Sequence, residues 1–184
     1  INLRGMLYAE RGDFLLAVND FTKALVLTNN KNKRARFFQE RARAFLEIDS
    51  SLLALKDLDS SIFLNPDDSY SYQTKAEIYW HLQNRNNLAL ENFNLLVEKA
   101  ILSNENDNIS DAYNVRAGFY HRALKETDLA IVDYNKSLEY YPLNYVVLGN
   151  LGNLYYEIFE YDKSLELYNL LVDSSLKNFN LGNI

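Results

Sequence analysis

The sequence predicts an all-α fold, a right-handed superhelical solenoid of antiparallel helix hairpins. The main observation is an internal repeat: a small residue followed three positions later by an aromatic residue recurs five times. The small residues are separated by 37, 34, 41 and 35 positions, and they are Gly5, Ala42, Ala76, Ala117 and Gly152. The chain has only 6 Gly and 2 Pro, which suits helices. A period near 34 residues built from two short helices is typical of helical-hairpin arrays.

A second pattern marks the second helix of each hairpin. Another small residue follows 12 or 13 positions after the first, and these are Ala17, Ala54, Ala89, Ala130 and Ser164. Four positions later comes a bulky apolar residue: Phe21, Leu58, Phe93, Tyr134 and Tyr168. Because the backbones of the two helices approach closely where they cross, we expect the small residues to be buried there. Pro66 and Pro142 stop one hairpin and suit the first turn of the next.

These patterns predict ten helices in five hairpins. In chain order, the pairs are 1–11 with 14–28, 33–47 with 50–63, 67–83 with 86–102, 109–124 with 127–140, and 143–158 with 161–176. We expect one array over 1–184, with repeats at roughly 1–31, 35–68, 69–103, 110–144 and 145–178. The third and fourth repeats carry one extra residue, which we place near the turns Gln83–Leu88 and Leu124–Leu129. The polar segment Ser103–Ser110 has no apolar period, so it is expected to be a mobile loop.

The fifth repeat carries the plainest family motif. Leu148-x₂-Leu151-Gly152-x₂-Tyr155, followed by Ser164-x₃-Tyr168, resembles the tetratricopeptide pattern W-x₂-L-G-x₂-Y then A-x₃-F. Five similar repeats in near register extend this resemblance over nearly the whole chain. Ile1 is not an initiator Met, and Phe179–Ile184 would open a further repeat, so we expect a piece cut from a longer array.

The resemblance implies a concave groove, lined by the first helix of each hairpin, that receives a peptide or a helix. The candidate groove residues form stripes at spacings of three or four, as one face of a helix requires. They are Arg36, Gln39, Arg43, Tyr70, Gln73, Glu77, Trp80, Asn114, His121, Asn153 and Tyr156, with Asp111, Gly118, Val146 and Gly149 in the same stripes. Asn and Gln can bond a peptide backbone, while Trp and Tyr supply contact area. The family's chaperone-tail clamp is not expected, because the matching positions hold Asn2, Met6, Glu40, Tyr70 and Thr74, without its basic anchors.

Composition narrows the function further. A net charge of −6 argues against a nucleic-acid partner, although Lys31–Arg43 carries six basic residues against Glu40. This local excess is interpreted as a solvated helix face. No apolar run is long enough to span a bilayer, and we expect no membrane contact from this segment. With no Cys, no phosphate-binding glycine loop and scattered carboxylates, catalysis is not expected. His81 and His121 have no nearby carboxylate from either of their two helices, so neither a metal nor another cofactor is predicted.

The sequence therefore predicts a non-catalytic protein–protein interaction module that acts as a scaffold or adaptor. Two alternatives remain: a scaffold that self-associates through open repeat ends, and the substrate-docking arm of a larger enzyme. The sequence identifies neither the protein or peptide ligand nor the compartment. We favour the cytoplasm, while a signal or lipid anchor could lie outside this piece. It also leaves open whether Ser103–Ser110 takes part in binding.

Overall fold

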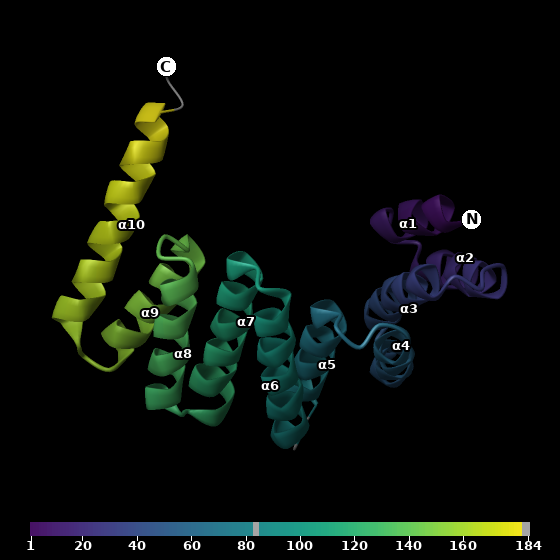
Figure 1. Cartoon of the computed structure of the whole chain (residues 1–184), viewed down its shortest axis with the longest axis horizontal. Coiled ribbons are helices and arrows are strands. Elements are labelled where there is room, and N and C mark those ends of the chain that lie inside the picture. Colours follow the sequence, from purple (N-terminus) through teal and green to yellow (C-terminus); the bar gives the residue numbers. More distant parts are fainter. Residues whose placement is uncertain (83–84, 182–184) are drawn as a thin grey trace. The chain divides into compact units, whose positions relative to one another are not determined.

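The computed structural model describes residues 1–82 and 85–181, with side chains up to Val172. This described part contains helices and no strands, which confirms the all-α prediction (Figure 1). The chain divides into two compact units, Ile1–Asn92 and Phe93–Ile184, which we call unit 1 and unit 2. None of the described helices is long and apolar enough to cross a membrane.

Unit 1 contains two complete hairpins and the start of a third. Its helices are α1 (Asn2–Glu10), α2 (Phe14–Val26), α3 (Lys31–Leu46), α4 (Ser51–Leu64), α5 (Ser69–His81) and the first part of α6 (Asn86–Ser103). Helix α1 pairs with α2 and α3 pairs with α4, while α2 packs on α3 and α4 packs on α5. Each second helix therefore lies between two first helices, as in a stack of hairpins.

Unit 2 repeats this arrangement. After the rest of α6 come α7 (Asn106–Phe119), the π-helical turn η1 (Tyr120–Leu124), α8 (Thr127–Tyr140), α9 (Tyr145–Glu157) and α10 (Tyr161–Leu181). Helix α7 pairs with α8 and α9 pairs with α10, and α8 also packs on α9. The core between α7, α8 and α9 includes Ala117, Tyr134, Leu151 and Leu154.

The small residues lie at the helix crossings, as predicted. The following seven alanines are fully buried: Ala17, Ala42, Ala54, Ala76, Ala89, Ala117 and Ala130. Gly152 and Ser164 are buried as well. A methyl group on Gly5 would lie 3.0 Å from Cε1 of Phe21, and one on Gly152 would lie 3.3 Å from Cζ of Tyr168. The crossings therefore leave no room for larger side chains.

The starts of the first helices and the hairpin turns follow local chemistry. The side chains of Asn30, Asp68 and Asn144 accept hydrogen bonds from the first turns of α3, α5 and α9, which satisfies amides that have no partner within the helix. The hairpin turns contain residues with left-handed backbones, and these are Gly12, Asp49, Lys125 and Phe159. Such a conformation lets the chain leave one helix and enter the next within a few residues.

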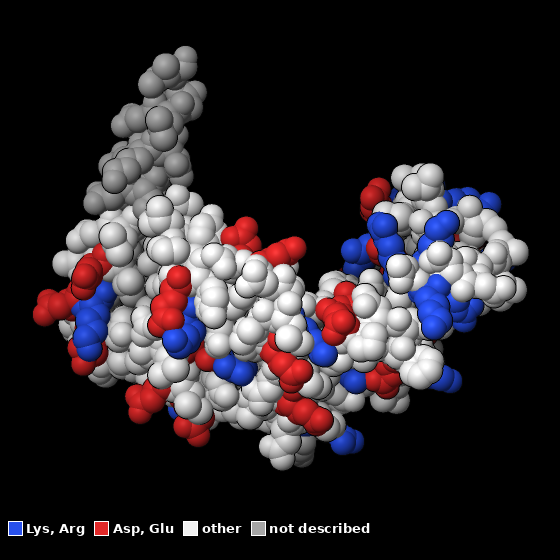
Figure 2. All heavy atoms as spheres, viewed as in Figure 1, with Lys and Arg blue, Asp and Glu red and all other residues white. Residues whose placement is uncertain are grey.

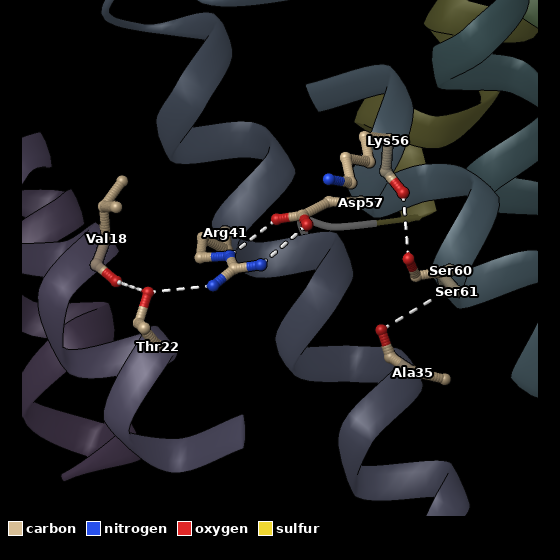
Figure 3. A network of polar contacts seen from close by, with 8 residues as sticks. All are labelled: Val18, Thr22, Ala35, Arg41, Lys56, Asp57, Ser60 and Ser61. Atoms are coloured by element: carbon tan, nitrogen blue, oxygen red, sulfur yellow. Dashed lines mark hydrogen bonds and ion pairs between the residues drawn. The ribbon is translucent and has the colours of Figure 1, made fainter. Parts of the chain in front are cut away.

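An arginine–aspartate pair joins the two helices of three hairpins, a feature absent from the sequence prediction. Arg41 donates from Nε and Nη2 to the two carboxylate oxygens of Asp57, at 2.7 Å each (Figure 3). The equivalent pairs are Arg4 with Asp20 and Arg116 with Asp133. Each Arg directly precedes the small residue of the first helix, and each Asp directly precedes the bulky residue of the second.

The other two hairpins replace this ion pair. In the fifth hairpin, apolar Leu151 and Leu167 occupy the two positions. In the third, Lys75 and Asn92 occupy them, and Lys75 binds Asp59 on α4 instead, with Nζ 2.5 Å from Oδ1. An ion pair and an apolar pair therefore serve the same crossing in different repeats.

The prediction of a mobile loop at Ser103–Ser110 is wrong. Helix α6 ends at Ser103 and α7 already begins at Asn106, so most of the segment is helical. Ile109 and Ser110 are buried, and the Ser110 hydroxyl lies 2.8 Å from that of Ser137. The polar composition of the segment suggested a loop. The Ser110 and Ser137 hydroxyls satisfy each other in the interior, so polar residues are compatible with a packed helix here.

The extra residue of the fourth repeat lies next to the turn Leu124–Leu129, near which it was predicted. It is accommodated by the π-helical turn η1, at Tyr120–Leu124, before the turn that follows Leu124. The corresponding prediction for Gln83–Leu88 falls partly on residues 83–84, outside the described residues. Phe179–Ile184 was expected to open a further repeat. For residues 179–181 this expectation is wrong, because helix α10 continues to Leu181. No Gly or Pro lies between Tyr161 and Leu181 to end the helix.

Candidate functional site

In unit 1, the predicted stripes of α3 and α5 adjoin. Gln39 on α3 donates from Nε2 to Oδ2 of Asp68, the residue that caps α5, at 2.5 Å. Gln73 on α5 donates to Glu77 one turn later, at 2.9 Å. Arg36 is exposed. The two first helices thus present amide and charged groups on neighbouring parts of the surface.

Tyr70 lies among charged groups of this surface. Its side chain is partly exposed at the start of α5. Burial of the remainder raises the pKa of Tyr70, Thr74 and Arg43 lower it, and Glu40 and Glu77 raise it. Arg43 itself binds Glu40 on the same helix, with Nη2 2.7 Å from Oε2. Charged groups from both helices therefore act on the Tyr70 hydroxyl.

A pocket of about 550 Å³ lies beside the end of α5. Two predicted residues, Glu77 and Trp80, contribute to its lining, together with apolar Leu46, Ile78 and Leu82. Trp80 is half-buried, and its ring stacks on that of His81 with centroids 5.7 Å apart. The pocket combines apolar walls with one carboxylate, which suits an apolar side chain that enters beside a polar group.

In unit 2, two residues of the predicted stripe that runs from α7 into η1 contact residues of α9. Asn150 donates to the Asn114 amide oxygen at 3.0 Å. His121 in η1 contacts the carboxylate of Glu157 at the end of α9, with Nε2 2.9 Å from Oε2. The predicted residues of these two first helices therefore lie on adjoining surfaces.

The remaining two predicted residues of unit 2 are exposed on α9. Asn153 accepts a hydrogen bond from the Tyr168 hydroxyl of α10, at 2.6 Å. The Tyr156 ring lies 5.5 Å from the ring of Tyr161. Both residues have polar or aromatic surface that solvent reaches.

Sequence reasoning missed two residues of the unit 2 surface. Glu157 continues the α9 stripe one turn beyond Asn153, so the four-residue spacing could have identified it. Asn150 neighbours Gly149 and carried no such signal, because it lies outside the stripe's spacing. Its contact with Asn114 depends on how α9 packs beside α7.

The basic run in α3 serves several purposes. Figure 2 shows Lys and Arg side chains gathered over the part of unit 1 that the N-terminal helices form. Within the run, Arg34 donates to the backbone oxygens of Leu25 and Thr28 near the end of α2, and Arg41 binds Asp57. Lys31, Lys33 and Arg36 are exposed. The interpretation as a solvated face therefore holds for part of the run only.

Nothing in the described residues resembles a metal centre, since they contain no cluster of three or more His, Cys, Asp or Glu side chains with metal-binding geometry. His81 stacks on Trp80, and His121 contacts Glu157. Each imidazole therefore has a protein neighbour of its own.

Comparisons with known proteins agree with this architecture. No family model matches the sequence, and no curated protein matches it. Among solved structures, MamA is similar over 96% of both chains, with a TM-score of 0.73 and 16% identity. PilF of Pseudomonas aeruginosa has a TM-score of 0.75 and 17% identity over 94% of this chain and 73% of its own. A thermophilic TPR protein of Thermus thermophilus has a TM-score of 0.65 and 18% identity, over 98% of this chain and 92% of its own.

These likenesses show the fold. The chain has the helical-hairpin architecture of tetratricopeptide-repeat proteins, which confirms the resemblance carried by Leu148–Tyr155 and its counterparts.

Proposed function

We propose that the chain is a non-catalytic protein–protein interaction module that binds a partner's peptide on the first-helix faces of its hairpins. The observation that carries this proposal is the adjacency of the stripes. Gln39 contacts the cap of α5 in unit 1, and Asn150 contacts Asn114 in unit 2. An extended peptide needs such a series of neighbouring polar and aromatic groups, and isolated side chains would not supply it.

In unit 1, the proposed contacts combine charge with an apolar pocket. The pocket beside Trp80 is suited to an apolar side chain, and Tyr70 offers ring surface and a hydroxyl. Exposed Arg36 adds a positive charge on α3, whereas the charge of Arg43 is balanced by Glu40 on the same helix. We therefore propose that the partner segment carries an acidic end near α3.

In unit 2, the proposed contacts are mainly amides. Asn114 and Asn153 each have groups left for a partner, because an Asn side chain offers two donor hydrogens and two acceptor sites. They can bond a peptide backbone without requiring particular side chains. We expect unit 2 to contribute affinity and unit 1 to contribute more of the selectivity.

The absence of catalysis is part of the same proposal. The carboxylates near the candidate surfaces have protein partners, with Glu40 bound to Arg43, Glu77 to Gln73 and Glu157 to His121. None of these three partners is a hydroxyl or a thiol. Docking of a substrate for a larger enzyme would use the same surfaces and is compatible with this proposal.

The test is to recover a partner from the source cell and to titrate its binding segment. Tyr70→Ala and Asn114→Ala should each weaken binding by about 1–2 kcal/mol without changing the helical circular dichroism signal. Arg43→Glu should chiefly slow association and reduce its salt dependence. The matched control is Asn135→Ala, at an exposed position of the second helix α8, which should leave binding unchanged. If all three surface variants bind with unaltered affinity, the proposal fails.

Self-association is a second candidate function, favoured by exposed apolar residues on α1 and α10. Leu3 and Leu7 are exposed on α1, and Leu165 and Val172 are exposed on α10. Such faces suit end-to-end stacking of copies, in which one hairpin continues another. Light scattering over a hundredfold range of protein concentration separates the candidates. Self-association is favoured if the molar mass rises with concentration and the Leu165→Glu variant has the mass of a single chain at every concentration.

A further inference from the structure

Residues 21–39 of unit 1 carry an unbalanced positive charge. This stretch runs from α2 into α3 and contains five Lys or Arg residues and no Asp or Glu. Lys31 and Lys33 are exposed and form no ion pair with any described residue. They lie at the start of α3, where the positive end of the helix dipole disfavours cations and where no acidic residue balances them. The two lysines therefore contribute nothing favourable to the fold, and an anionic partner outside the chain would give them a role.

Two exposed apolar side chains lie beside these cations. Val26 is 80% exposed and Leu27 is 70% exposed, at the end of α2. Exposed Lys23 precedes them by three and four positions, so the three residues share one face of the helix. The start of α3 is held against the end of α2, because Arg34 donates to two backbone oxygens there, at 2.5 and 3.2 Å. The lysines of both helices therefore flank the apolar pair.

A third exposed apolar residue belongs to the same surface. Phe63, near the end of α4, is 85% exposed and lines a shallow pocket of about 470 Å³ with Arg34, Lys56 and Asp59. Phe63 and the end of α2 therefore both adjoin Arg34. The carboxylate of Asp59 is bound by a lysine of α5, and exposed Asp67 bounds the surface beyond Phe63. We call the following residues the basic–apolar surface: Lys23, Val26, Leu27, Lys31, Lys33 and Phe63.

The repeats of unit 2 carry charged residues at the corresponding position. Val26 and Phe63 each lie nine positions after the small residue of their second helix, and the equivalents in the third and fourth repeats are Glu98 and Glu139. Both glutamates are exposed. The hairpin therefore accommodates a carboxylate at this position, and helix packing does not require the apolar residues of unit 1.

We propose that the basic–apolar surface docks on a membrane surface that contains anionic phospholipids. Exposed apolar side chains gain free energy by entering the boundary between headgroups and acyl chains, and lysines are attracted to anionic headgroups. A nucleic acid would use the cations through its phosphates but would leave Val26 and Leu27 in water. The expectation of no membrane contact considered apolar runs that could span a bilayer, and docking of this kind needs none. The inference is independent of the proposed peptide binding.

Co-sedimentation of the whole chain with lipid vesicles tests the electrostatic part. The vesicles contain two parts of phosphatidylcholine to one part of phosphatidylserine, and phosphatidylcholine alone is the control. We expect binding to the mixed vesicles only, and added salt should weaken it because salt screens the charges. Lys31→Gln with Lys33→Gln should weaken binding about 25-fold, since each lysine near such a surface contributes about fivefold. Lys136→Gln with Lys163→Gln removes the same charge from exposed positions of unit 2 and should leave binding nearly unchanged.

Two further variants test the apolar part. Val26→Glu and Phe63→Glu each copy the residue that unit 2 carries at this position. Each should weaken binding to mixed vesicles by about tenfold or more, because an apolar contact is lost and a repelled charge is gained. The matched control is Leu52→Glu, which adds the same charge at a residue that is 79% exposed at the other end of α4. That variant should bind nearly as the original chain does.

Insertion into the lipid has a readout of its own. The chain contains no Cys, so a single introduced Cys can carry an environment-sensitive fluorophore. With mixed vesicles, the emission of the label should shift to the blue at Val26→Cys and Phe63→Cys, and should stay unchanged at Leu52→Cys.

The inference is overturned if mixed vesicles are not bound, or if the lysine and glutamate variants bind them as the original chain does. It is also overturned if neither label at Val26 and Phe63 shifts. Oligouridylate is the remaining probe, and a chain that binds it but ignores the vesicles has a nucleic-acid surface instead. Circular dichroism of each variant should match that of the original chain.

Discussion

Arg41 and Asp57 form a two-pronged ion pair across the second hairpin, with Nε–Oδ2 and Nη2–Oδ1 distances of 2.7 Å. The Asp57 side chain is 6% exposed and that of Arg41 is 17% exposed, so the pair is largely removed from water. Arg41 also donates from Nη1 to the Thr22 hydroxyl of α2, at 2.9 Å (Figure 3). One side chain therefore connects its own hairpin to the preceding one.

Breaking this pair should be costly. Arg41→Leu leaves the Asp57 carboxylate buried without its cation, and we expect a loss of about 3–5 kcal/mol in the free energy of unfolding. The double variant Arg41→Leu with Asp57→Leu copies the apolar pair of the fifth hairpin and should recover most of that loss. Urea unfolding followed by circular dichroism measures both.

The exposed pair of Arg11 with Asp13 is the control for this comparison. Arg11→Leu should change stability by less than about 1 kcal/mol, because solvent screens an exposed pair. If the double variant at Arg41 and Asp57 is no more stable than the single one, the equivalence between the ionic and the apolar crossings is wrong.

Enlarging a crossing residue should destabilise its own hairpin. Ala130 is fully buried where α8 crosses α7, so Ala130→Leu should cost about 1–3 kcal/mol through overpacking. Because a hairpin array is held by local contacts, hydrogen exchange should accelerate mainly in α7–α9. Asn135→Leu, on the exposed side of α8, should have little effect. A uniform loss of protection along all described helices would contradict this expectation.

Two substitutions in the hairpin turns should change the free energy of unfolding in opposite directions. Lys125 has a left-handed backbone, with φ of 60°, which costs a non-glycine residue energy. Lys125→Gly should raise the free energy of unfolding by about 0.5–1 kcal/mol. Gly12 has φ of 86° and open space at Cβ, so Gly12→Ala should lower it by about 1 kcal/mol. Thermal unfolding measures both changes. If both variants become more stable, or both less stable, backbone strain in the turns does not explain the stability changes.

The start of α7 should contribute to the stability of the fold, although its polar composition is typical of a mobile loop. Ser110→Ala removes the hydroxyl that lies 2.8 Å from Ser137 and that accepts from Asn144 at 3.2 Å. We expect a loss of about 1–3 kcal/mol, because buried groups lose their partner. Ser60→Ala, whose hydroxyl only bonds back to its own helix at the surface, should cost about 0.5 kcal/mol or less. Chemical unfolding measures both losses. If Ser110→Ala costs as little as Ser60→Ala, the segment behaves as a loop and the expectation is contradicted.

The parts of the fold that the sequence predicted are those set by repeated local chemistry. Ala42, Ala76 and Ala117 recur at one position because every crossing excludes a larger side chain, so periodicity alone located them. The pair of Arg41 with Asp57 was not predicted, since residues 16 positions apart meet only after the hairpin closes. The helical start at Ser110 was missed for a related reason, because its polar groups are satisfied by Ser137 and Asn144 from later helices.

The candidate surface was predictable in the same limited sense. Spacing placed Tyr70, Gln73 and Glu77 on one helical face, and the structure places them there. The neighbours that define their chemistry, such as Arg43 beside Tyr70, come from another helix.

The central claim is that the partner lies on the first-helix faces, and site-specific photo-crosslinking tests it most directly. A benzophenone amino acid is placed at Gln73 on α5 or Asn153 on α9, and in separate variants at exposed Lys56 on α4 or Asn135 on α8. The partner segment recovered by titration is added before illumination. The proposal predicts crosslinks from the two first-helix positions and none from the two second-helix positions. Crosslinks confined to Lys56 and Asn135 would contradict it and move the binding surface to the second helices.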